Sequence, residues 1–86
     1  MPRVSEFFGV VIAMYFNDHN PPHFHAEYAD DEASFSINTL EILEGELPRR
    51  ARALVVEWAS LHRRELLTNW ERARRELPLQ AIEPLE

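Results

Sequence analysis

The segment that most constrains the fold is residues 7–16, in which aromatic and β-branched side chains predominate. Such residues are typical of strands, and the run is short enough to form one strand. Both sets of alternate positions are apolar, so both faces of this strand should be covered. One helix covers only one face of a sheet. We therefore expect the other face to contact the C-terminal tail, a loop or a second subunit.

The length of the chain, 86 residues, is enough for one small α+β domain spanning residues 1–86. The absence of cysteine excludes disulfides, thiolate metal sites and thiol nucleophiles. The N-terminus lacks the basic start of a signal peptide, and no apolar run approaches the roughly 20 residues that span a bilayer. We expect a soluble cytoplasmic protein that does not bind a membrane.

The net charge of −6 is divided unevenly along the chain. Residues 1–47 carry nine acidic residues and one arginine, a net of −8, whereas residues 48–86 carry eight arginines and six glutamates, a net of +2. No lysine is present. An acidic chain of this kind binds duplex nucleic acid poorly, so RNA is a partner that we consider but do not favour.

The remaining sequence predicts an antiparallel sheet followed by helix. Residues 17–22 are rich in turn residues, with Pro21-Pro22 as a candidate cis bond, and residues 23–28, 33–37 and 40–44 read as strands. Apolar residues then recur at helical spacing from Pro48 to about residue 76, a run long enough to break near residues 68–69. The predicted fold class is α+β, with a three- to four-stranded antiparallel sheet packed against one long or broken C-terminal helix.

Three of the four histidines lie within residues 19–25, which makes this stretch the candidate site. On a strand, His23, His25 and Glu27 project from one face with neighbours roughly 6.5 Å apart, and the preceding turn can fold His19 over them. Imidazoles and a carboxylate together bind divalent transition metals such as zinc. His19, His23 and His25 with Glu27 or Asp18 therefore predict a metal site with room for water and for hydrolysis.

Two other interpretations of this stretch stay open. Without a metal, His19, His23 and His25 could act on phosphate as general acid and base, which would suit a ribonuclease. Alternatively, the imidazoles could be structural partners of loop carbonyls. These three histidines are therefore candidate catalytic residues, and whether the protein is an enzyme is left undecided.

The fourth histidine, His62, has a different setting. It lies on the apolar stripe of the predicted helix, with Glu65 three residues further on. That stripe packs against the sheet face opposite the other histidines, so we expect His62 to be structural and to bond Glu65 or a backbone carbonyl. Trp58 and Trp70 share the stripe and are expected in the core, not stacked on nucleic-acid bases.

Four motifs together resemble a known family. They are residues 2–9, the His-Asn-Pro-Pro-His-Phe-His string of residues 19–25, Leu-Pro-Arg-Arg at residues 47–50, and residues 58–66. They are similar to the short bacterial proteins described as domain of unknown function 4160 (DUF4160), and the similarity covers essentially the whole chain. The family brings no catalytic assignment, so His19, His23 and His25 carry over only as signature positions.

The family resemblance implies a function through a partner. Such proteins are often encoded beside a second small domain of unknown function, of the 2442 type, in an arrangement that resembles a toxin–antitoxin pair. We therefore expect one component of such a pair, acting by protein–protein interaction, with a metal-dependent or metal-free hydrolase or ribonuclease as the alternative. The apolar first strand favours a homodimer or a complex with the protein encoded next to it, through that surface or the arginine side of the helix.

Overall fold

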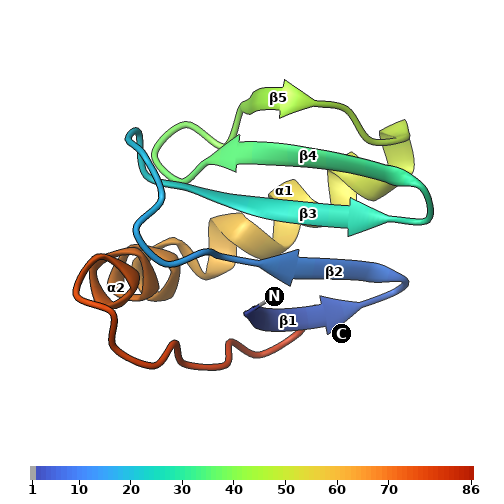
Figure 1. Cartoon of the computed structure of the whole chain (residues 1–86). Coiled ribbons are helices and arrows are strands. Elements are labelled where there is room, and N and C mark those ends of the chain that lie inside the picture. The colour runs from blue at the N-terminus through green and yellow to red at the C-terminus, as the bar shows by residue number, and fades with distance from the viewer. Residues whose placement is uncertain (1) are drawn as a thin grey trace.

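The computed structural model describes residues 2–86. Its elements are β1 (Arg3–Phe7), β2 (Val10–Ala13), β3 (His23–Tyr28), β4 (Asp31–Ser36), β5 (Ile42–Gly45), α1 (Arg49–Leu61) and α2 (Arg63–Arg74). The strands form one antiparallel sheet in the order β1-β2-β3-β4-β5, followed by the two helices (Figure 1). The predicted α+β class is confirmed, but the sheet has five strands where three or four were expected. Within the described residues, neither helix is long and apolar enough to cross a membrane.

The additional strand arises because residues 7–16 contain a tight turn. Phe8 and Gly9 have φ values of 48° and 84°, and positive φ at both central residues is typical of a two-residue type I′ hairpin turn. Phe7 then pairs with Val10 across the hairpin. The exposed Phe8 made the turn look like a continuous apolar strand. The prediction of one strand here was therefore wrong.

The helical region is divided at His62, so the prediction of a break near residues 68–69 was wrong. His62 has φ −125° and ψ 24°, outside the helical region, and lies between α1 and α2. Asn69 is a buried residue inside α2. Its side-chain amide donates to the Gln80 carbonyl and its oxygen accepts from the Gln80 N–H, both at 2.8 Å. Asn69 therefore holds the C-terminal tail and does not interrupt the helix.

The core lies between the sheet and α1, with Trp58 at its centre. The Trp58 side chain is fully buried, with ring centroids 5.4 Å from Phe7 and 6.0 Å from Phe24. Its indole N–H donates to the Glu83 carbonyl in the tail at 2.8 Å. Trp70 is also buried, so the expectation that both tryptophans lie in the core is confirmed.

The C-terminal tail runs from α2 along the outer edge of the sheet, beside β1 (Figure 1). The Ile82 N–H donates to the Val4 carbonyl at 2.8 Å, and the Ile82 side chain is buried. The tail therefore occupies the outer edge of β1. On the sheet face away from α1, part of the cover comes from the loop after β2, where Tyr15 contacts His25. The loop therefore covers part of β3 on that face, and the tail lies along the edge of β1.

Replacing Asn69 with alanine is expected to release the tail. The substitution removes both side-chain partners of the Gln80 backbone, and an unsatisfied pair of this kind costs about 1–3 kcal/mol. Hydrogen exchange should therefore accelerate at Gln80 and Ile82 more than in β3. Gln80→Ala keeps the backbone groups and is the matched control, with exchange close to the wild type. Unchanged exchange in Asn69→Ala would show that this contact does not hold the tail.

Candidate metal centre

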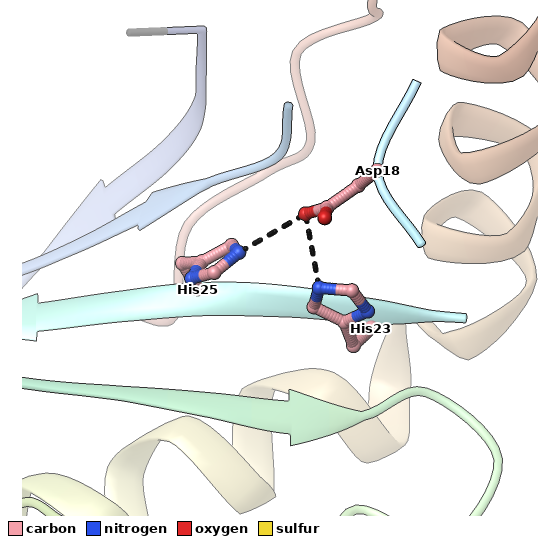
Figure 2. Close-up of side chains that lie close together, drawn as sticks. All are labelled: Asp18, His23 and His25. Carbon is pink, nitrogen blue, oxygen red and sulfur yellow. Dashed lines mark hydrogen bonds and ion pairs between the residues drawn. The ribbon is translucent and has the colours of Figure 1, made fainter. Parts of the chain in front are cut away.

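The loop after β2 folds Asp18 over β3, where it meets His23 and His25 (Figure 2). Asp18 Oδ2 lies 3.0 Å from His23 Nε2 and 3.3 Å from His25 Nε2. The three ligand atoms all lie within 4.8 Å of one another. Ligands bound at about 2.0–2.1 Å to one ion are roughly 2.9–3.4 Å apart in octahedral or tetrahedral geometry. The two oxygen–nitrogen distances therefore match the spacing around a single metal ion.

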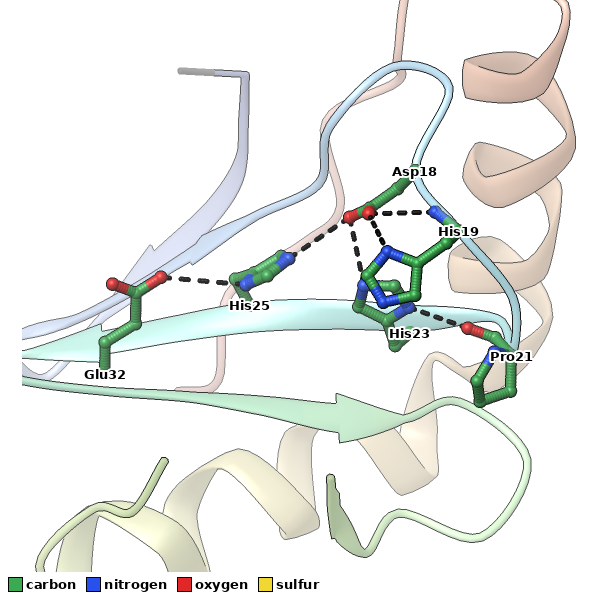
Figure 3. A network of polar contacts seen from close by, with 6 residues as sticks. All are labelled: Asp18, His19, Pro21, His23, His25 and Glu32. Atoms are coloured by element: carbon green, nitrogen blue, oxygen red, sulfur yellow. Dashed lines mark hydrogen bonds and ion pairs between the residues drawn. The ribbon is translucent and has the colours of Figure 1, made fainter. Parts of the chain in front are cut away.

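The second nitrogen of each imidazole faces an acceptor (Figure 3). His23 Nδ1 lies 2.7 Å from the Pro21 carbonyl oxygen, which can only accept, so Nδ1 carries the proton. His25 Nδ1 lies 3.6 Å from Glu32 Oε2. With Nδ1 protonated, the Nε2 lone pair of a neutral imidazole points at the Asp18 carboxylate. Two acceptors that face each other need a positive charge between them. Either a proton on Nε2 or a cation bound by both Nε2 and the Asp18 carboxylate supplies it.

The Asp18 carboxylate is fixed from its own loop. Its Oδ1 accepts from the His19 backbone N–H at 2.9 Å. Burial by itself raises the pKa of Asp18, but that hydrogen bond and the neighbouring His25 and His23 outweigh it, so the pKa lies below its usual value. The preceding residue, Asn17, has φ 55° and donates its N–H to the Ala73 carbonyl at the end of α2. The loop therefore presents an ionised carboxylate to the two imidazoles.

Two aromatic rings flank the cluster. Tyr15 packs edge-on against His25, with ring centroids 4.7 Å apart. Burial, and then the carboxylates of Glu32, Glu27 and Asp18, raise the pKa of Tyr15, so its phenol is neutral. The α2 helix reaches the end of the sheet, where Trp70 lies 5.2 Å from the His23 ring. These contacts hold the imidazole rings in place, and neither aromatic residue was singled out for the site from the sequence.

The structure brings together two of the four predicted ligands, His23 and His25, and leaves His19 and Glu27 outside the three-residue group. The His19 side chain is 77% exposed, and its Nδ1 lies 3.1 Å from the other carboxylate oxygen of Asp18. Glu27 pairs with Glu32 across β3 and β4, two positions beyond His25. Asp18, the alternative carboxylate in the sequence analysis, is the one that completes the group.

His62 is separate from this group, as predicted. Its Nδ1 lies 2.6 Å from Glu65 Oε1, and its ring packs 5.5 Å from Trp58. The expected bond to Glu65 is therefore confirmed. The sheet face opposite α1 carries His25, while His62 lies in the connection between the helices.

The fold and the cluster define a class of small α+β protein with an aspartate and two histidines gathered at one end of a five-stranded sheet. The chain belongs to the family described as Domain of unknown function (DUF4160), which it matches over residues 9–71. That match includes the three clustered residues and confirms the resemblance seen in the sequence motifs. No curated protein and no solved structure matches the chain.

Proposed function

We propose that this protein binds one divalent transition-metal ion, such as zinc, through Asp18, His23 and His25. The observation that carries the proposal is the convergence of two Nε2 atoms on one carboxylate oxygen while both Nδ1 atoms face acceptors. Metal-binding histidines almost always donate their other N–H to a carbonyl or carboxylate, which fixes the ring and its tautomer. The Pro21 carbonyl has the position of such a partner for His23, and Glu32 lies on the same side of His25, with its Oε2 3.6 Å from Nδ1 and beyond direct hydrogen-bond distance.

Three protein ligands favour a hydrolytic role over a purely structural one. Structural zinc sites have four protein ligands, whereas catalytic sites have three and hold water in the fourth position. The side chains of His25 and Asp18 are 21% and 17% exposed, so solvent reaches the site. A metal-bound water is a nucleophile near neutral pH. The activity that we propose is therefore metal-dependent hydrolysis.

The surroundings of the cluster give less support to metal-free cleavage of RNA. Two surface hollows of about 220 and 300 Å³ adjoin His25 and His23, and among residues 2–86 neither is lined by arginine. Glu44 lines both hollows, and Glu32 lines the one beside His25. Carboxylates at these positions would repel a phosphodiester backbone.

The decisive experiment is a calorimetric zinc titration of the untagged protein. We expect one ion per chain and a higher melting temperature with zinc, because the ion binds only the folded arrangement. Asp18→Asn removes the anionic ligand at nearly constant shape and should weaken zinc binding at least about 100-fold, or ~2.7 kcal/mol.

Glu27→Gln is the matched control for that substitution. It makes the same carboxylate-to-amide change on β3, outside the three-residue group, and should leave zinc affinity within about threefold of the wild type, less than ~0.7 kcal/mol. Zinc binding by the wild type no stronger than by Asp18→Asn would contradict the proposal. It would then follow that protons, and not a metal, hold the cluster together.

Action through a partner protein in a toxin–antitoxin-like pair, a homodimer, and a cytoplasmic location stay predictions from the sequence. A partner requires a surface that the fold leaves open. The edge of the sheet at β5 is such a surface.

A further inference from the structure

The two edges of the sheet differ. The β1 edge is in contact with the C-terminal tail, whereas β5 is the last strand on the other side and pairs only with β4 (Figure 1). Among the described residues, no backbone hydrogen bond joins Ile42–Gly45 to a segment outside the sheet. An open edge of this kind is a template for another extended chain.

Hollows lie on both sides of β5. On the α1 side, a hollow of about 720 Å³ has a mixed lining. Its apolar residues include Leu40, Ile42 and Val56, and its charged residues, two arginines and two glutamates, balance one another: Arg49, Arg52, Glu41 and Glu57. On the opposite side, the two hollows beside the histidines include Leu43 and Glu44 in their lining. Side chains of an added strand alternate between the two faces of a sheet. The register shift between Ile42 and Glu44 places these two side chains opposite neighbouring residues of β4, so a strand paired with β5 would place side chains in hollows of different character on either side of Leu43.

The charge around β5 selects the kind of strand that fits. Residues 30–46 carry six acidic residues and no lysine or arginine. Glu32 and Glu44 both line the hollow on the histidine side. Pairing β5 with the β5 of a second copy would bring the acidic side chains of the two copies close together, which is unfavourable. A basic segment is complementary.

We infer that β5 binds an extended segment of a partner protein in which lysine or arginine alternates with apolar residues. The basic side chains lie over Glu32 and Glu44, and the apolar ones face Leu40, Ile42 and Val56. Main-chain hydrogen bonds supply affinity, and the alternating hollows supply specificity. This inference does not depend on metal binding.

The test is a titration of the ¹⁵N-labelled full chain with a capped peptide of alternating lysine and valine, followed by NMR. We expect amide shift changes and slower hydrogen exchange centred on Ile42–Gly45. The same peptide methylated on alternate backbone nitrogens lacks the donors for one edge and should bind at least about tenfold more weakly. A glutamate–valine peptide of equal length should also bind at least about tenfold more weakly.

Two variants of the protein test whether the peptide binds at β5. Glu44→Lys should weaken binding of the lysine–valine peptide at least about tenfold. Glu6→Lys makes the same charge change on β1 and should leave the affinity for the peptide within about threefold of the wild type. Three results would overturn the inference: no shifts at β5, equal binding of the methylated peptide, or equal effects of the two variants. Shifts at β5 that depend on protein concentration without peptide would assign the edge to a second copy instead.

Discussion

Replacing Trp58 with alanine is expected to destabilise the protein more than any other change considered, by about 3–5 kcal/mol. The side chain is fully buried between the sheet and α1, in contact with Phe7 and Phe24, and its N–H binds the tail at Glu83. A chain of 86 residues has a total stability of about 4–13 kcal/mol. The variant should therefore be partly or wholly unfolded at 37 °C.

Urea unfolding followed by far-ultraviolet circular dichroism measures this loss without relying on tryptophan emission. Trp58→Phe is the graded control, because it keeps an aromatic ring between Phe7 and Phe24 and removes the bond to Glu83. Its cost should be clearly smaller than that of alanine. A decrease below about 1.5 kcal/mol in the free energy of unfolding of Trp58→Ala would contradict the position of Trp58 at the centre of the core. A decrease that small is typical of a partly exposed side chain.

Replacing His25 with alanine is expected to weaken zinc binding at least about 100-fold, which is a loss of ~2.7 kcal/mol in binding free energy. His19→Ala should change zinc affinity less than about threefold, or ~0.7 kcal/mol. His25 supplies a nitrogen to the cluster, while His19 is exposed, packs its ring 5.2 Å from that of His23 and has its Nδ1 beside the other oxygen of Asp18. The two substitutions remove the same chemical group from positions six residues apart. They therefore distinguish membership of the cluster from mere proximity.

Competition with a chromophoric chelator measures both affinities under the same conditions. Melting temperatures of the zinc-free variants serve as the control for folding. Equal losses in His25→Ala and His19→Ala would contradict the ligand set taken from the structure. They would support the four-ligand set predicted from the sequence, in which His19 closes over the strand.

The strand that carries the site was predictable because its pattern is local. The turn residues before it and the acidic turn after it set the bounds of β3, and alternation placed His23 and His25 on the face away from Phe24. The bond between His62 and Glu65 was predictable for the same reason, since three residues separate the two side chains along the chain.

The missing parts of the prediction depend on contacts between distant segments. Asp18 reaches the histidines because Asn17 adopts positive φ and bonds to Ala73, 56 residues further on. Asn69, with its turn-forming side chain, stays helical because the tail returns to satisfy it. The Pro21-Pro22 bond was the candidate for cis geometry, but the cis bond is Asn20-Pro21. The residue types at these positions do not show which segments, distant in the sequence, come into contact in the fold.

The contact between the tail and β1 limits how large an assembly can become. A sheet with two open edges can add copies at both sides and grow into a fibre. Here the hydrogen bond from the Ile82 N–H to the Val4 carbonyl places the tail against the β1 edge, which disfavours addition of another strand there. The tail thus protects β1 against the edge-to-edge growth that an uncovered strand invites.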